Sequence, residues 1–238
     1  MEAKEKNKAP EETKALLVTK ANSLIEAAYT LSLNEQRIIL ACAAQLDGRK
    51  PPPRNTFLLT VDEFQGLFGT DPKSTYKEME EATNRLYERD IRKIDGQTRK
   101  RMRWVYMAEY QKGEGRVKLG FSPEITPYLT MLNKRHTTYQ LNEVRGLGSA
   151  YSIRLYEMLA RFRDTGWFAI SVDDFKERLQ LVGKYPRFSN LKARVIDPAV
   201  KEIRAKTSLD VSWQPIKKGR TVETIRFSFE EKAQMELL

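Results

Sequence analysis

The sequence predicts an α+β protein built from two tandem winged-helix domains, each a helix-turn-helix followed by a β-hairpin wing. Three observations predict this fold: one pattern occurs twice, both copies have the same order of elements, and the composition is strongly basic. The segment Thr60–Phe64 (TVDEF) reappears about 111 residues later as Ser171–Phe175 (SVDDF). A period this long indicates a duplicated domain rather than a solenoid repeat, and we expect a pseudo-twofold axis to relate the copies.

The correspondence between the two copies extends to their expected cores and hairpins. The paired positions are Met79 with Leu191, Thr83 with Val195, Tyr87 with Ala199, Ile91 with Ile203, Trp104 with Trp213, and the alternating residues Val117, Leu119 and Phe121 with Ile225, Phe227 and Phe229. Each copy therefore reads as helix, short strand, helix, helix and two-stranded hairpin, which is the order of a winged helix.

The first copy is assigned to an N-terminal domain at residues 14–134. Residues 1–13 mix charges without apolar periodicity, so we expect a disordered lead. A short helix is expected over residues 24–29, and Asn34 is the expected cap of the next helix. The later elements are a loop at prolines 51–53, a strand over 57–59, a helix capped by Thr60, a helix from Pro72 to Arg89, a turn at 95–96, strands over 101–111 and 116–121, and a connecting helix over 122–132.

The second copy is assigned to a C-terminal domain at residues 135–238, reached through a crossing segment at 133–139. Its expected elements are a helix over 150–162, a strand over 166–170, helices over 173–181 and 188–205, and strands over 210–216 and 222–229 joined by the turn 217–220.

The composition favours a protein that binds a polyanion. Lys and Arg number 42 and Asp and Glu 32, so the formal net charge is +10. A surplus of charge for solubility is the alternative interpretation.

The single cysteine, Cys42, lies in an apolar run and is interpreted as a small buried side chain in a reducing compartment. Since no apolar stretch is long enough for a bilayer and no signal-peptide core is present, we expect a cytoplasmic protein.

The third helix of the second copy is the expected reading helix, because a helix-turn-helix places its later helix in the major groove. At 100° per residue, Leu191, Val195 and Ile203 turn toward the core. The outward positions are Ser189, Asn190, Lys192, Ala193, Ile196 and Asp197, with Arg187 and Arg194 at the margins.

The outward side chains have the chemistry needed to read bases. Lys192 can reach guanine acceptors, Asn190 an adenine, and Ala193 or Ile196 a thymine methyl group. The long side chains at the margins are expected to contact phosphates. An ordinary solvated helix face is the alternative.

The equivalent helix of the first copy turns Lys73, Ser74, Lys77, Glu81 and Asn84 outward. This face is more acidic, and carboxylates near phosphates are usually repelled. We therefore expect the second domain to carry most of the base readout and the first domain mainly to position the protein.

Both expected wings are basic. Lys217, Lys218 and Arg220 surround Gly219 at one hairpin tip, and Arg99, Lys100, Arg101 and Arg103 flank the other. Charges at a hairpin tip are often only solvated. In a fold of this type we expect them to contact phosphates.

We expect no enzyme site, no metal and no cofactor. The one histidine, His136, is expected in a solvated linker and cannot form the paired-histidine metal site of a nickase. No P-loop motif is present in the sequence. The pair Asp173-Asp174 repeats Asp62-Glu63 at a helix start, so these acids are interpreted as helix caps and dipole partners.

Over roughly residues 18–230 the sequence also resembles the Rep initiator proteins of iteron-containing, theta-replicating bacterial plasmids. The segments that carry the resemblance are Val18–Ala27, Leu33–Leu40, Ser149–Glu157, Lys218–Arg220 and Ile225–Phe229. It implies two winged-helix domains that bind repeated origin sequences as a monomer and repress their own promoter as a dimer. It also implies melting of nearby A·T-rich DNA, and recruitment of the host initiator and replicative helicase.

The resemblance further implies that Lys192 and Arg194 read bases, with Ala193 standing where the family often has a third basic residue. We therefore interpret the protein as a non-enzymatic, sequence-specific initiator of plasmid replication that binds double-stranded DNA. A tandem winged-helix repressor without a replication role and a DNA-nicking initiator enzyme are the alternatives.

Overall fold

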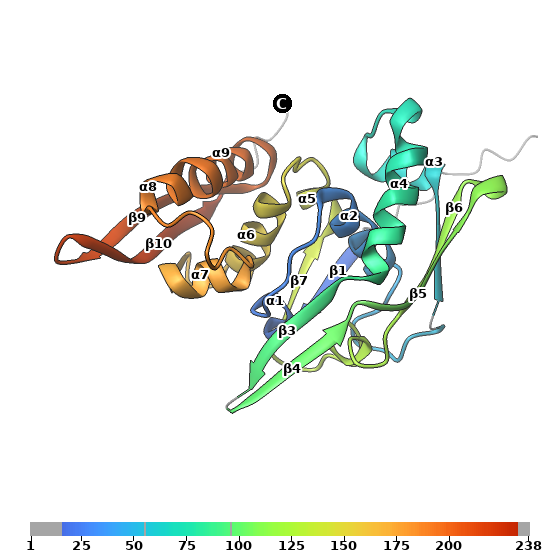
Figure 1. The fold of residues 1–238 in the computed structure, drawn as a ribbon, viewed down its shortest axis with the longest axis horizontal. Coiled ribbons are helices and arrows are strands. Elements are labelled where there is room, and N and C mark those ends of the chain that lie inside the picture. The colour runs from blue at the N-terminus through green and yellow to red at the C-terminus, as the bar shows by residue number, and fades with distance from the viewer. Residues whose placement is uncertain (1–15, 55, 96, 233–238) are drawn as a thin grey trace, which may run out of the picture.

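The computed structural model describes residues 16–54, 56–95 and 97–232, and the expected disordered lead at residues 1–13 lies outside them. The first module contains α2 (Leu33–Ala43), β2 (Thr56–Thr60), α3 (Val61–Phe68), α4 (Pro72–Tyr87), β5 (Val105–Gln111) and β6 (Arg116–Phe121). The second contains α6 (Ala150–Ala160), β8 (Trp167–Ser171), α7 (Val172–Arg178), α8 (Phe188–Leu191), α9 (Asp197–Lys206), β9 (Leu209–Lys218) and β10 (Thr221–Glu231). Figure 1 shows the second module in yellow to red at the left and the first in blue to green at the right.

The duplication predicted from the sequence is confirmed by the order of the elements and of the strands. The first module has a sheet in the order β2-β6-β5, and the second has one in the order β8-β10-β9. In both, the short strand before the second helix pairs with the last strand of the hairpin. The chain therefore contains two winged helices, an α+β arrangement.

The repeated segment TVDEF/SVDDF caps the second helix of each module. The Thr60 hydroxyl oxygen accepts from the Glu63 backbone N–H at 3.1 Å, and Ser171 Oγ accepts from the Asp174 N–H at 3.0 Å. Acidic residues occupy the first turn of α3 and of α7, where they interact favourably with the helix dipole. The interpretation of these acids as dipole partners is confirmed. As caps it is wrong for Asp173 and Asp174, because the capping residues are Thr60 and Ser171, and only Glu63 completes a capping box.

Two helix starts in the first module differ from expectation. The cap of α2 is Ser32 and not Asn34, because Ser32 and Glu35 form a capping box with reciprocal side-chain to backbone hydrogen bonds. The short first helix, α1 (Asn22–Ile25), begins earlier than expected.

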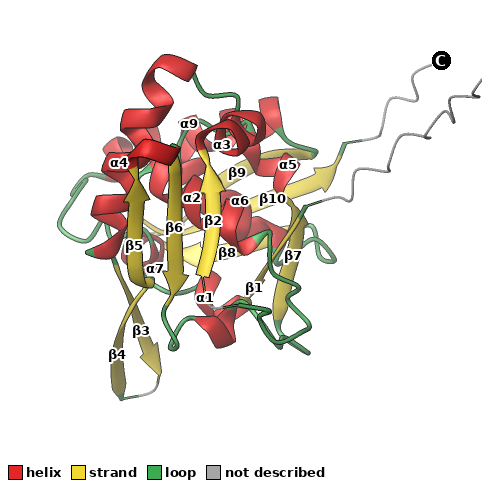
Figure 2. Cartoon of the chain, turned by 90° about the vertical axis from the view of Figure 1, so that its right-hand side faces the viewer, coloured by secondary structure: helices red, strands yellow, loops and turns green. Residues whose placement is uncertain are grey.

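The hairpin of the first module was only partly predicted. The expected strand over 101–111 is divided at Trp104 into β4 (Thr98–Arg103) and β5, and β4 pairs with β3 (Asp90–Asp95). Ile91 is buried as expected but lies on β3, and Tyr87 is exposed at the end of α4. The β3–β4 ribbon has no counterpart among the second module's elements, and Figure 2 shows it extending below the sheet.

Residues expected to link the domains form other structures. The helix expected over 122–132 is only a 3-10 turn at Thr126–Tyr128, since Pro127 lacks an N–H for a helical hydrogen bond. His136, expected in a solvated linker, lies in β7 (His136–Gln140), which pairs antiparallel with β1 (Leu17–Ala21). The helix α5 (Leu141–Arg145) follows directly.

The core includes both modules and the segment between them. Cys42 is fully buried, as predicted, and burial raises the pKa of its thiol to about 12. In the described part of the chain, no helix is long and apolar enough to span a membrane.

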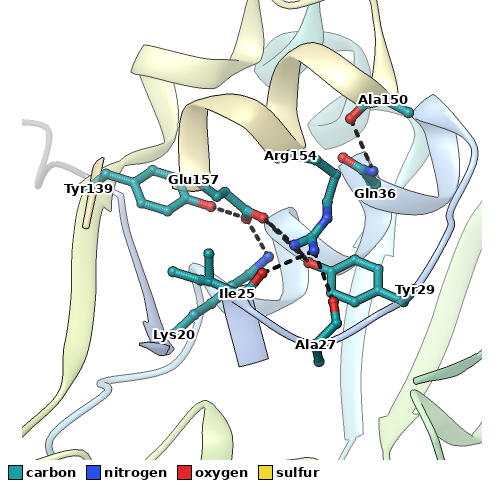
Figure 3. A network of polar contacts seen from close by, with 9 residues as sticks. All are labelled: Lys20, Ile25, Ala27, Tyr29, Gln36, Tyr139, Ala150, Arg154 and Glu157. Carbon is teal, nitrogen blue, oxygen red and sulfur yellow. Dashed lines mark hydrogen bonds and ion pairs between the residues drawn. The ribbon is translucent and has the colours of Figure 1, made fainter. Parts of the chain in front are cut away.

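Helix α6 is fastened to the N-terminal segment by a buried network centred on the Glu157 carboxylate (Figure 3). Glu157 accepts from Lys20 Nζ at 2.5 Å and from the Tyr139 hydroxyl at 2.7 Å. Arg154 Nη1 lies 3.3 Å from the other carboxylate oxygen and also donates to the Tyr29 hydroxyl. All of these residues are at most 3% exposed, so α6 is fixed by charges that water does not screen.

The Arg154 guanidinium completes this network through backbone atoms. Its Nη2 donates to the carbonyl oxygens of Ile25 at 3.0 Å and Ala27 at 3.1 Å, and its guanidinium carbon lies 3.7 Å from the centroid of the Tyr29 ring. The Gln36 side-chain amide adds a bond to the Ala150 carbonyl at 3.3 Å. Segments before residue 37 are thereby joined to the start of the second module.

We expect Glu157→Gln to lower the free energy of unfolding by about 3–5 kcal/mol, because it leaves two buried cations without their anion. Urea unfolding measures the loss. Glu223→Gln is the matched control, since Glu223 lies 3.7 Å from Lys218 in an exposed pair, and it should change stability by less than about 0.5 kcal/mol. Equal effects of the two substitutions would contradict the structural role of the network.

The same carboxylate should contribute to acid sensitivity. Burial acts to raise the pKa of Glu157, but Lys20 and Arg154 outweigh it and hold the pKa below its ordinary value of 4.5. A depressed pKa in the folded state means that the stabilisation is present above the unfolded value and is lost as the pH falls. Unfolding measured from pH 6 downward should therefore show a steeper loss of stability in the unaltered chain than in Glu157→Gln.

Candidate nucleic-acid interface

The expected reading helix is present as one continuous helical segment from Phe188 to Lys206. Leu191, Val195 and Ile203 are buried, as predicted. The exposed predicted residues along it are Ser189, Asn190, Lys192, Ala193 and Arg194, with Arg187 immediately before it. The structure therefore brings the six predicted residues of this segment together on the solvent side of one helix.

Ile196 was predicted to face outward, and this prediction is wrong because Ile196 is fully buried. Residues Lys192–Ile196 form a π turn, in which the Asp197 N–H bonds to the Lys192 carbonyl. The widened turn changes the rotation per residue, so a projection at 100° per residue fails from this point. Pro198 accounts for the turn, since it lacks an N–H and its ring would clash with the Arg194 carbonyl in a regular helix.

Lys192 is held by a side chain that sequence analysis did not connect with it. Its Nζ lies 2.5 Å from Asp197 Oδ2 and 5.7 Å from the centroid of the Trp213 ring. Trp213 Nε1 donates to the other carboxylate oxygen of Asp197 at 3.1 Å. Pro198, which lies inside the expected helix, was the signal in the sequence for the π turn. This turn makes the contact between Lys192 and Asp197 possible.

The reading helix is anchored to the rest of its module through Glu202. Its carboxylate accepts from the Gly148 N–H and from Lys206 Nζ, each at 2.7 Å. Burial acts to raise the pKa of Glu202, but the bonds from Lys206 and Gly148 lower it, so the anion is favoured. This contact fixes α9 to the loop before α6.

The wing of the second module has the predicted basic tip. Lys217, Lys218 and Arg220 are all exposed where β9 turns into β10, and Gly219 takes a φ of 62°, which a residue without Cβ adopts most easily. In Figure 1 this hairpin projects to the left end of the molecule, beyond α8. Cations at this tip can reach a duplex that contacts α8.

In the first module, α4 presents Lys73 and Lys77 as exposed side chains, while Ser74 is half-buried. The position of α4 is set by Glu35 of α2, which is fully buried. Arg89 forms a two-pronged contact with this carboxylate, at 2.8 Å and 3.1 Å, and Arg85 lies 3.2 Å from it. These contacts hold α4 rigidly against α2, as is required of a helix whose exposed face is expected to position the protein.

Arg99, Lys100 and Arg101 were predicted to flank the tip of the first wing, and this is wrong. They are exposed residues of β4 in the separate β3–β4 ribbon, whereas the β5–β6 wing turns at Lys112–Gly115. The cause is the division at Trp104, which removes the basic run from the wing. The β5–β6 tip carries Glu114, paired with Arg116, so it is not a purely cationic tip.

The ribbon places like charges opposite each other across its two strands. Arg92 faces Arg101 and Lys93 faces Lys100 in the register of β3 and β4. Directly opposed like charges destabilise a strand pair, and an ion pair between Arg101 and Asp90 offsets part of this repulsion. Among the described residues, no group of three or more His, Cys, Asp or Glu is placed to hold a metal ion.

Comparison with known families gives two matches that divide the chain in the same order as the two winged helices. The family model described as "Initiator Replication protein, WH1" matches residues 17–160, and "Initiator Rep protein, WH2" matches residues 171–229.

Individual relatives give a consistent result. A replication initiation protein of Escherichia coli is 29% identical over 233 residues, covering 94% of this chain and 72% of the relative. The PI protein of Escherichia coli is 25% identical over 256 residues, covering 87% and 80%. The crystal structure of the Pi initiator protein in complex with iteron DNA aligns with a TM-score of 0.79 at 24% identity, covering 92% of this chain and 99% of that one, which shows the shared fold.

We expect Ile196→Ala to lower the free energy of unfolding by about 2–5 kcal/mol, because it removes a fully buried side chain from the core. Arg194→Ala, two positions earlier and exposed, should change it by less than about 0.5 kcal/mol. Urea unfolding of both variants makes the comparison. A negligible effect at position 196 would mean that the helix turns regularly and that Ile196 faces solvent.

Proposed function

The chain belongs to the initiator Rep protein family, and on this premise we propose that it starts plasmid replication by binding repeated origin sequences (iterons) as a monomer. The observation that carries the proposal is the set of exposed residues Ser189, Asn190, Lys192, Ala193 and Arg194 on one helix, together with the cationic tip of Lys217, Lys218 and Arg220. This combination offers base-reading side chains and phosphate contacts on one module. The shared fold with a protein crystallised on iteron DNA supports the same function.

The proposed complex uses both modules, which we assign to residues 14–134 and 135–238. We infer that a pseudo-twofold relation lets α4 and the Phe188–Lys206 helix enter successive major grooves about 34–36 Å apart, giving a site of roughly 20 bp. Lys73, Ser74 and Lys77 would position the first module. Arg99, Lys100 and Arg101 would contact phosphates from the β3–β4 ribbon, where Lys100 and Arg101 lie opposite Lys93 and Arg92 of the facing strand.

We further propose that a dimer represses the chain's own promoter, and that the origin-bound monomer recruits the host initiator and the replicative helicase. The proposal includes no catalytic step. Lys192 and Arg194 are the proposed base-reading cations, and no cofactor is required for any step.

A plasmid-maintenance assay tests the proposed function. The protein is supplied from a second replicon, and a plasmid carrying the origin region from beside its gene is tested for persistence. Persistence supports initiation, whereas repression of the gene's promoter without persistence would favour a winged-helix repressor with no replication role. Relaxation or covalent attachment of supercoiled origin DNA in magnesium would instead identify a nicking enzyme.

At the level of residues, we expect Lys192→Ala to weaken binding to the origin repeat by about 1–3 kcal/mol, since it removes a base contact. Lys218→Ala should weaken binding to all sequences to a similar extent and reduce the salt dependence, because a phosphate contact is lost. Affinities for the origin repeat and for random duplex over a range of salt concentrations distinguish the two. Equal losses on both DNAs for Lys192→Ala would remove Lys192 from the base-reading set.

A further inference from the structure

The ion pair between Lys192 and Asp197 depends on the π turn. Residues five apart in an α-helix are rotated by about 140°, too far for their side chains to meet. The π turn closes between these same two residues, with the Asp197 N–H bonded to the Lys192 carbonyl, so one lies above the other. Their side chains then come within 2.5 Å, measured from Nζ to Oδ2.

The Asp197 carboxylate is itself held in place from the hairpin. Trp213 Nε1 donates to its Oδ1 at 3.1 Å, and Trp213 lies on β9 opposite Phe227 of β10. The same indole ring makes an edge contact with Phe188, with centroids 6.1 Å apart, and faces the Lys192 ammonium. A strand of the wing therefore fixes the direction in which the lysine points.

An acid on this helix face is unexpected for simple phosphate binding, because it repels the DNA backbone. Within the described residues, Arg187 and Arg194 on the same segment have no acidic partner within ion-pair distance, so the acid acts on Lys192 alone. An ammonium already paired with a carboxylate gains little from an arbitrary phosphate. It still gains from a base edge whose acceptors match its fixed direction.

We propose that Asp197 is a positioning residue that determines specificity: it orients Lys192 toward base edges and suppresses its binding to phosphates. This inference rests on the proposed function, since it assigns a role within the proposed reading face. Trp213 supports it by holding the carboxylate.

The test compares affinity for two DNAs measured with the full chain. The specific probe is the duplex that the unaltered chain enriches from a random pool, and the competitor is an unselected duplex of the same length. For Asp197→Asn, binding to the unselected duplex is retained or strengthened, because a negative charge is lost. Binding to the enriched duplex weakens, so that the ratio of the two affinities falls about tenfold. Trp213→Phe, which removes the N–H donor but keeps an aromatic ring, gives a smaller fall in the same direction.

Two further variants separate positioning from general effects. In a Lys192→Ala background, Asp197→Asn leaves the ratio unchanged, because the acid acts through the lysine. Asp210→Asn is the matched control, since Asp210 pairs with Arg204 at 2.7 Å on the same module, and its loss alters both affinities equally. Thermal unfolding confirms that each variant is folded, and Trp213→Phe carries the test if Asp197→Asn is not.

The outcomes are distinct. An unchanged ratio in Asp197→Asn, or the same fall in the Lys192→Ala background, overturns the positioning role while leaving the proposed function intact. Failure of the unaltered chain to enrich any duplex overturns the proposed function and this inference with it.

Discussion

The Glu157 carboxylate lies where β1, the segment after α1 and helix α6 meet, and it sets the constraint on which the arrangement of the modules depends. Residues 152–160 of α6 are all buried, so its charged side chains have no water to solvate them. They are satisfied by Lys20, Tyr29 and Tyr139, and these contacts fix α6 against the N-terminal segment and β7. Since α6 also packs against α9, the direction of the reading helix relative to the first module follows from the same contacts.

The two winged helices have the same order of elements but differ in the side chains that hold and surround the third helix. Each fixes its third helix through a carboxylate, but Glu35 receives Arg85 of α4 and Arg89 just after it, whereas Glu202 lies on α9 itself and receives a loop N–H. Charge is distributed differently as well. The second module concentrates its cations at the wing tip, while the first has a wing that carries Glu114 and a separate basic ribbon. This difference in charge is the basis for the proposal that one copy reads bases and the other positions the duplex.

Local patterns in the sequence predicted the helices, strands and turns that depend on residues close together in the chain. The capping segments at Thr60 and Ser171, the apolar spacing of Leu191 and Val195, and the Gly219 turn all lie within a few residues of their partners, so the order of elements could be predicted. Pairing of β1 with β7 could not, because short strands far apart in the sequence carry no signal of register. The exposed face of the reading helix was predicted up to Arg194. Beyond it, the assumption of 3.6 residues per turn failed at the π turn before Pro198.

The β1–β7 ribbon has a consequence for synthesis on the ribosome. Leu17 pairs with Gln140 and Ala21 with His136, so the nascent chain must grow by at least 115 residues after β1 before its partner strand exists. At about 5–20 residues per second this delay is roughly 6–23 s, far longer than a helix or hairpin needs to form. During that time β1 has no partner strand, and the carboxylate of Glu157 that pairs with Lys20 has not yet been translated. Formation of the β1–β7 ribbon is thus timed by elongation, although β1 itself is translated early.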